Sequence, residues 1–174
     1  MAPENSFREM TATFEQLSPE ERIRTILRIG EPGKKRLTAA FIEEQCKLKS
    51  FEKLSDTEAK ATYTFKVEHF YTNGSGNLQG GAQSMIFDIC TSLTLQAIST
   101  PGRFLNGGVS RVLTVNYLRP APEGSELELE TEVISVGKTL AMTRGTLRRA
   151  SDGAAISTCE HNKAAVPTKP QWKL

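Results

Sequence analysis

The sequence has few of the residues that metal centres and disulfide frameworks require. Three cysteines and two histidines occur in 174 residues, and no two cysteines have the CxxC spacing that is typical of zinc sites. Because an odd number of cysteines does not fit a complete set of disulfides, Cys46, Cys90 and Cys159 are expected to be reduced. We therefore expect no bound metal, and no residue pattern indicates another cofactor.

The sequence also lacks long apolar runs and a strong excess of charge. No stretch approaches the ~18 apolar residues of a membrane-spanning helix, and the first ten residues carry acids where a secretory signal is apolar. The 22 basic and 20 acidic residues leave a net charge of +2, without the dense basic block of a nucleic-acid-binding protein. We expect one globular chain in the cytoplasm, with the mitochondrion as the alternative, and neither a membrane span nor a nucleic-acid partner.

The segment 18–30, SPEERIRTILRIG, has the signals of a short helix. Ser18 is a favourable N-cap, and Pro19 follows in the first turn, where proline is tolerated. Apolar residues then recur at helical spacing up to a terminating glycine. We assign residues 1–36 to a leader with this helix and residues 37–174 to the main domain.

Alternating apolar and polar residues predict strands in most of the rest of the chain. The segment 37–54 fits either a helix or a strand. Clear strands are expected at 61–70 and in four later segments, 109–118, 125–136, 140–150 and 154–166. The short, turn-rich loops between the last four predict an antiparallel meander. In ELELETEV the apolar residues, with Leu127 first, all face one way, so one face of the sheet is expected to be buried.

Residues 82–98 predict one long helix that covers this face of the sheet. Its apolar stripe consists of Met85, Ile86, Ile89, Cys90, Leu93 and Ala97. Asp88 lies near the edge of the stripe, and a charge beside an apolar face is unfavourable unless it is compensated. Thr91 and Ser92, one turn further on, are candidate hydrogen-bond partners. Periodicity alone fits either a functional carboxylate or an ordinary boundary acid.

Four short motifs surround this helix in a particular order. Asn73 lies in the preceding loop, QGG forms residues 79–81, and Asp88 follows Gly80 by eight residues. GVSRVLTVNYLRPA at 108–121 and GKTLA at 137–141 come later. Over about residues 60–166 the sequence thus resembles the hotdog-fold acyl-CoA thioesterases, in the branch of the PaaI-type and thioesterase-superfamily-member enzymes. The resemblance implies an α+β fold, an antiparallel sheet wrapped around one long central helix, here with an extra N-terminal helix.

The resemblance also implies roles for individual residues in hydrolysis of an acyl-CoA thioester. The N–H of Gly80 and the side-chain amide of Asn73 would polarise the thioester carbonyl, a role that suits a helix N-terminus. Asp88 would act as the base or nucleophile, and Ser110 would help to hold the water. The substrate-binding residues would be Gln79, Gly81, Lys138 and Thr139.

Coenzyme A carries phosphates, so a basic residue near the tunnel mouth is expected. Lys138 is the main candidate, and it lies in the matched GKT segment. The weaker candidates on the flanking strands are Arg111, Arg144, His161 and Lys163. Each of the five, Lys138 included, also fits a solvated charge on the sheet face.

One residue departs from the pattern of the family, and it leaves alternatives open. Gln79 stands where the family usually has histidine, and a glutamine cannot carry a proton at neutral pH. We interpret Gln79 as a residue that positions the loop asparagine. The alternatives are a non-catalytic acyl-CoA-binding or assembly protein, and a hotdog dehydratase. The dehydratase is disfavoured because neither histidine lies in the glycine–helix segment.

Helix geometry adds a prediction about assembly. A rise of ~1.5 Å per residue places Asp88 ~12 Å from Gly80 along the helix, whereas a carbonyl and its attacking water must lie ~3 Å apart. One helix therefore cannot serve both ends of the reaction. We expect Gly80 of one chain to face Asp88 of another across a two-fold axis, in a homodimer or a dimer of dimers.

Overall fold

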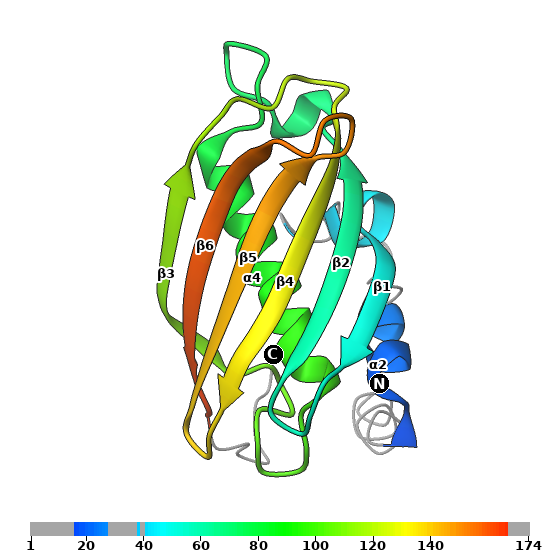
Figure 1. Cartoon of the computed structure of the whole chain (residues 1–174), viewed down its shortest axis with the longest axis vertical. Coiled ribbons are helices and arrows are strands. Elements are labelled where there is room, and N and C mark those ends of the chain that lie inside the picture. The colour runs from blue at the N-terminus through cyan, green and yellow to red at the C-terminus, as the bar shows by residue number, and fades with distance from the viewer. Residues whose placement is uncertain (1–15, 28–37, 39–40, 167–174) are drawn as a thin grey trace, which may run out of the picture.

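The computed structural model describes residues 16–27, 38 and 41–166. Its main feature is a six-stranded antiparallel sheet with the strand order β1-β2-β4-β5-β6-β3 (Figure 1). The strands are β1 Lys47–Lys53, β2 Ala59–Lys66, β3 Val109–Tyr117, β4 Glu126–Val136, β5 Leu140–Arg149 and β6 Ala155–Ala164. Strands β1 and β3 each have one neighbour, so they form the two edges of the sheet.

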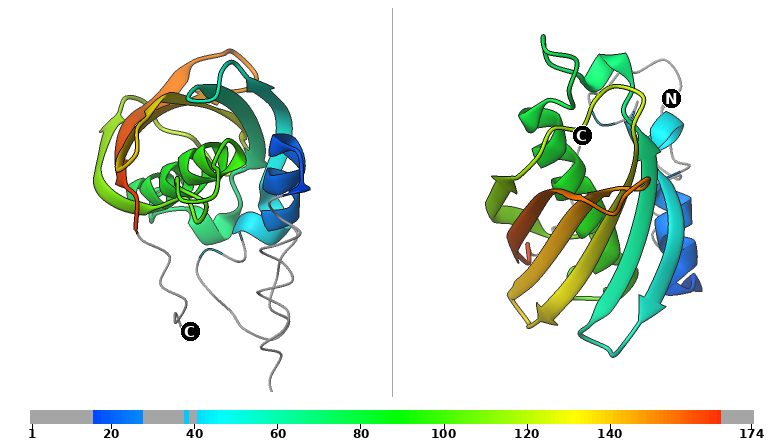
Figure 2. Two further views of the ribbon diagram at one scale, coloured as in Figure 1. Left: turned by 90° about the horizontal axis from the view of Figure 1, so that it is seen from below. Right: turned by 45° about the horizontal axis from the view of Figure 1, so that its top comes forward.

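One long helix, α4 (Gly80–Ala97), lies in the concave face of the sheet, which curves around it (Figure 2). Phe87 of α4 is fully buried under Gly145 of β5, where an added Cβ would lie 2.9 Å from the ring. Because Gly145 has no side chain, the helix approaches the sheet closely at this point. The predicted α+β arrangement of a sheet around one long helix is confirmed.

The predicted N-terminal helix is confirmed as α2 (Pro19–Ile26). The Ser18 hydroxyl accepts a hydrogen bond from the N–H of Glu21, and the Glu21 carboxylate accepts one from the N–H of Ser18. This capping box stabilises the first turn, and Ile23 is fully buried in the main core. The predicted helix end at residue 30 lies outside the described residues, and the domain boundary stays a prediction. No helix in the described ranges is long and apolar enough to cross a membrane.

The predicted meander of the last four strands is wrong at its first strand. Strands β4, β5 and β6 are successive neighbours, but β3 pairs with β6 instead of β4. After β3 the chain crosses the upper end of the sheet and enters β4 between β2 and β5 (Figure 1). Residues 118–125 make this crossing, which is longer than a tight hairpin. As a result β3 is an edge strand.

The ambiguous segment 37–54 contains both kinds of structure where it is described. A π-helical turn, Phe41–Gln45, precedes strand β1. The ring of Phe41 is fully buried and meets Phe65 and Tyr71 edge to face, with centroid distances of 5.3 and 6.2 Å. These aromatic contacts fix the entry to β1 against the core.

A buried hydrogen-bond network joins α4 to the sheet. The Thr94 hydroxyl lies 3.0 Å from the hydroxyl of Tyr63 on β2 and 2.7 Å from that of Thr131 on β4. Burial raises the pKa of Tyr63 well above its usual range, so this phenol stays neutral. Leu127, Leu129 and Thr131 share the buried face of β4, which confirms the alternation predicted there. The helix is therefore held in a fixed rotation relative to the sheet.

Candidate active site

Asp88, in the middle of α4, is oriented by a residue of the edge strand. The Ser110 hydroxyl on β3 donates a hydrogen bond of 2.6 Å to Asp88 Oδ1. The Asp88 side chain is 47% exposed, so the carboxylate is held in place and still reachable from outside. The two residues that the resemblance assigns to the attacking water are thus adjacent in the fold.

The hydrogen-bond partners predicted for this carboxylate on its own helix are wrong. The Thr91 hydroxyl donates to the carbonyl of Phe87 at 2.7 Å, and the Ser92 hydroxyl donates to the backbone carbonyl of Asp88 at 2.6 Å. Both hydroxyls bond the carbonyl four residues earlier, as serine and threonine commonly do inside helices. The carboxylate is instead approached from the sheet.

An irregularity in β3 places Ser110 on the inner face. Ser110 pairs with Lys163 of β6 and Val112 pairs with Asn162, so Arg111 is an extra residue in β3. A β-bulge of this kind changes which face the next side chains occupy. Without it, the alternation from Leu113, which packs on the core, would direct Ser110 outward. The bulge thus brings the hydroxyl to the helix.

His161 of β6 is fully buried beside Asp88. Its Nδ1 lies 2.7 Å from the Thr91 hydroxyl. Burial, reinforced by the charge of Lys163, lowers the pKa of His161 to about 4, while Asp88 opposes this shift. The imidazole is therefore neutral at neutral pH. Its Nε2, without a hydrogen-bond partner in the described part of the chain, faces Asp88 Oδ1 at 3.4 Å.

Lys163 joins the same cluster, so two of the weaker phosphate-binding candidates are reassigned. Lys163 is only 3% exposed, and its Nζ donates to the hydroxyls of Ser92 at 2.8 Å and Ser110 at 3.3 Å. Neither Lys163 nor His161 is available at a tunnel mouth. The alternation of β6, in which Cys159 also faces inward, contains the signal that could have placed both residues inside.

The cluster does not form a metal site. Asp88 and His161 supply two side chains of the types that ligate metals, whereas sites usually use three or more. Across residues 16–27, 38 and 41–166, no group of three or more His, Cys, Asp or Glu side chains could hold a metal ion.

The N-terminal end of α4 is covered by two side chains. Gln79 is the N-cap, and its Oε1 accepts a hydrogen bond of 3.0 Å from the N–H of Gly80. The Tyr117 hydroxyl donates to the Gly80 carbonyl at 3.0 Å, and its ring would lie 3.4 Å from a Cβ at Gly80. Next to it, Gly81 is exposed. Sequence reasoning missed Tyr117, although it lies in the YLRPA motif.

Asn73 is held in a way that presents its amide group. Its Oδ1 accepts hydrogen bonds from the N–H groups of Ser75 at 2.9 Å and Asn77 at 3.2 Å. Because the oxygen is anchored by the loop, the NH2 group is directed away from these two amides. The hydrogen bond of the Gln79 side chain goes to Gly80 and not to Asn73. Within one chain, Gln79 therefore acts as a helix cap.

The predicted coenzyme A contacts are dispersed in a single chain. Lys138 and Thr139 are exposed in the turn between β4 and β5, at the end of the molecule opposite to the start of α4 (Figure 1). Arg144 pairs with Glu132 on the outer face of the sheet, and Arg111 is exposed on the β3 edge. None of these four lies at the Gly80 end of its own chain.

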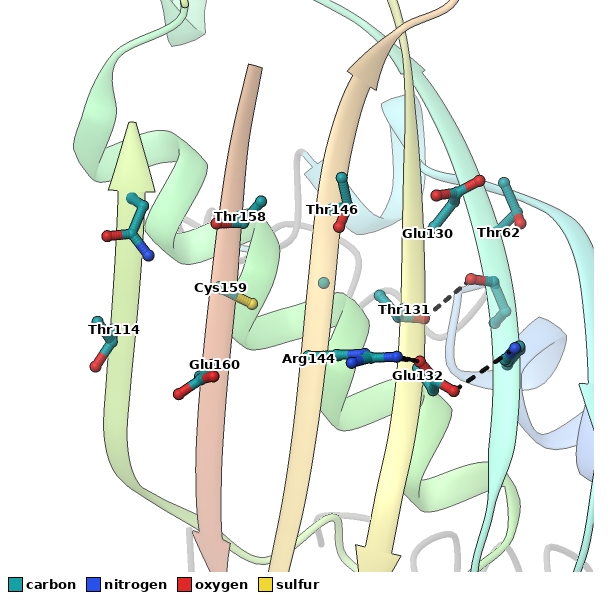
Figure 3. A pocket seen from close by; sticks show the side chains of 14 residues that line it. Thr62, Thr114, Glu130, Thr131, Glu132, Arg144, Thr146, Thr158, Cys159 and Glu160 are labelled. Carbon is teal, nitrogen blue, oxygen red and sulfur yellow. Dashed lines mark hydrogen bonds and ion pairs between the residues drawn. The ribbon is translucent and has the colours of Figure 1, made fainter. Parts of the chain in front are cut away.

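A hollow lies on the other side of the sheet, away from α4. This groove of about 680 Å³ is lined by outward-facing threonines and charged side chains (Figure 3). Glu132 pairs there with Arg144 and with Lys60. The groove has neither an apolar wall for an acyl chain nor a contact with Asp88, so we do not assign it to the active site.

Comparison with solved structures defines the fold class. Zebrafish thioesterase superfamily member 2 superimposes with a TM-score of 0.69 at 22% sequence identity, covering 86% of this chain and 99% of that one. The sheet wrapped around one helix is therefore a hotdog fold. This confirms the fold that the resemblance implied.

Comparison of sequences shows which proteins this chain is similar to. Residues 75–156 match the thioesterase superfamily. A putative esterase of Caenorhabditis elegans is 32% identical over 114 residues, which is 66% of this chain and 65% of that protein. Human acyl-coenzyme A thioesterase 13 is 28% identical over 129 residues, which is 70% of this chain and 89% of the human protein. The chain thus spans slightly less than two thirds of the worm protein.

Proposed function

We propose that this protein is an acyl-CoA thioesterase that hydrolyses a thioester to a free acid and coenzyme A. The observation that carries the proposal is the hydrogen bond from Ser110 to Asp88, which orients a reachable carboxylate inside the segment that matches the thioesterase superfamily. The name of the human relative supports the reaction. A hypothetical thioesterase of Streptococcus pneumoniae with a similar fold was solved with coenzyme A, which supports the ligand.

In the proposed reaction, the two ends of the site act on the two reactants. The N–H of Gly80 and the amide of Asn73 polarise the thioester carbonyl, whose oxygen takes the place of the Gln79 side-chain oxygen. A water held between Asp88 and Ser110 attacks the carbonyl carbon, and Asp88 accepts its proton. The tetrahedral species then collapses, the C–S bond breaks, and the thiolate of coenzyme A leaves.

The edge strand β3 supports the proposed dimer. Its backbone groups on one side have no neighbouring strand, and exposed edges of this kind pair readily with another chain. Val109, Val112 and Tyr117 on this strand, and Leu118 just after it, are each between 51% and 53% exposed. Exposed apolar residues along a free edge favour an interface.

The direction of β3 explains why such a dimer completes the site. The Ser110 end of β3 lies against Asp88, and the Tyr117 end lies against Gly80 of the same chain. If two copies pair β3 antiparallel across a two-fold axis, the Ser110 end of one strand lies beside the Tyr117 end of the other. Asp88 of one copy then approaches Gly80 of the second copy. A dimer of dimers and a cytoplasmic location remain part of the proposal.

A panel of thioesters tests the proposed activity against the non-catalytic alternative. Wild-type protein is mixed with short, long and aromatic acyl-CoA esters, and free thiol is measured over time together with ligand binding. We expect thiol release from at least one class of ester, above the rate without protein. Tight binding without release from any ester would instead favour the acyl-CoA-binding alternative.

A further inference from the structure

Lys163 is a buried cation that the proposed reaction does not use. It is 3% exposed on β6, directly opposite Ser110 of β3 in the strand register. A buried ammonium group is unfavourable unless hydrogen bonds and opposite charge compensate it. No carboxylate in the described part of the chain forms an ion pair with Lys163 within 4.0 Å, and its hydrogen bonds go to two hydroxyl groups.

The protons in this cluster can be assigned from the hydrogen bonds. An ammonium group only donates, whereas a hydroxyl has one proton to give and lone pairs to accept with. Because Lys163 donates to Ser110, the single proton of Ser110 must point elsewhere, and Asp88 Oδ1 receives it at 2.6 Å. The same holds for Ser92, which accepts from Lys163 and donates to the backbone carbonyl of Asp88.

We infer that Lys163 is a positioning residue of the hydrolytic centre, whose ammonium group holds the Ser110 hydroxyl as a donor to Asp88. This inference rests on the proposed thioesterase function. If Lys163 is neutral or absent, Ser110 is free to turn its proton toward the water or toward another acceptor. The carboxylate then loses its fixed orientation toward the attacking water, so proton transfer from this water becomes less efficient.

The ionisation of Lys163 gives the inference a pH signature. Burial lowers the pKa of Lys163 below its ordinary range, and the charge of Asp88 partly offsets this effect. The other titratable group that faces it is His161, which is neutral near pH 7. Activity that requires the ammonium form must therefore fall as the pH rises through the pKa of Lys163, at a lower pH than for an exposed lysine.

The first test removes the charge. In Lys163→Met a flexible apolar side chain replaces the amine. We expect kcat/KM for an active ester to fall about 10- to 100-fold, at or below the lower end of the range for loss of a general base. KM and the far-UV spectrum should stay nearly unchanged, and the alkaline decrease in activity should disappear. Lys49→Met, which removes an exposed ammonium paired with Glu128, is the matched control and should keep wild-type kinetics.

The second test asks whether Lys163 acts through Ser110. In a double-mutant cycle, Lys163→Met should lower kcat/KM much less in a Ser110→Ala background than in the wild type, because the link is already broken. Ser110→Ala alone should also lose the decrease in activity at alkaline pH. This measurement can be made even if the Lys163→Met variant does not fold. Equal losses in both backgrounds, or an unchanged alkaline decrease in Ser110→Ala, would overturn the inference.

Different results contradict the proposed thioesterase function and the positioning role of Lys163. A wild-type protein that releases no thiol at any pH contradicts the proposed function. A wild-type protein that hydrolyses esters, with a Lys163→Met variant of wild-type kcat/KM and pH profile, contradicts the role of Lys163 alone.

Discussion

Asp88→Asn is expected to lower kcat about 10²- to 10⁴-fold, the range for loss of a general base. Asparagine has nearly the same shape as aspartate and still accepts the hydrogen bond from Ser110, but it cannot take a proton from water. Binding of the acyl-CoA ester should therefore be nearly unchanged. Thiol release and ligand titration on the same preparation measure the two effects separately.

Glu160→Gln is the matched control for this change. Glu160 lies on the exposed side of β6 and lines the outer groove, away from the helix, so its replacement should leave kcat unchanged. If thiol release in Asp88→Asn is as fast as in the wild type, Asp88 is not the base. A parallel loss in both variants would indicate a general effect of removing negative charge.

Val112→Lys is expected to convert dimers to monomers and to remove most of the activity. Val112 is 53% exposed on the β3 edge. In a β3–β3 dimer the introduced ammonium group lies beside Arg111 and near the same introduced lysine of the second chain. An unpaired charge in an interface is unfavourable by about 3 kcal/mol, which corresponds to roughly a 100-fold increase in the dimer Kd. Sedimentation velocity and thiol release, measured over the same range of protein concentrations, test both effects.

Leu54→Lys provides the control, because Leu54 is also exposed but lies in the turn between β1 and β2 at the other side of the sheet. It should sediment as the wild type does. Activity of Val112→Lys should return at high protein concentration as dimers form again. A Val112→Lys variant that is fully active as a monomer would show that each chain contains a complete site.

Local patterns in the sequence predicted those features that depend on neighbouring residues. The capping residue Ser18 and the buried alternation from Leu127 onward were predicted because caps and strand faces depend on local spacing. The order of the strands in the sheet was not predicted, since it depends on pairing between segments far apart in the chain. The position of β3 at the edge therefore had to come from the structure.

In the candidate site, too, some features follow from the sequence and others only from contacts between distant segments. The resemblance assigned Asp88 and Ser110 to the same attacking water, and the structure joins the two by a hydrogen bond although they are 22 residues apart. Periodicity did not distinguish a hydroxyl that reaches a carboxylate from one that bonds its own helix, which is why Thr91 and Ser92 were misassigned. The sequence fits His161 and Lys163 as phosphate-binding or solvated charges because buried ionisable groups are uncommon, whereas the structure places both on the inner face of β6.

Mixing two inactive variants tests the shared site most directly. Asn73→Asp keeps the oxygen that anchors the loop but removes the NH2 donor, so this chain lacks the carbonyl-binding half, whereas Asp88→Asn lacks the base. After co-unfolding and refolding of equal amounts, about half of the dimers contain both chains, and each of these has one intact site of two. The account predicts recovery of about a quarter of the wild-type thiol-release rate. Activity that stays at the level of the separate variants, in a preparation shown to contain mixed dimers, would contradict it.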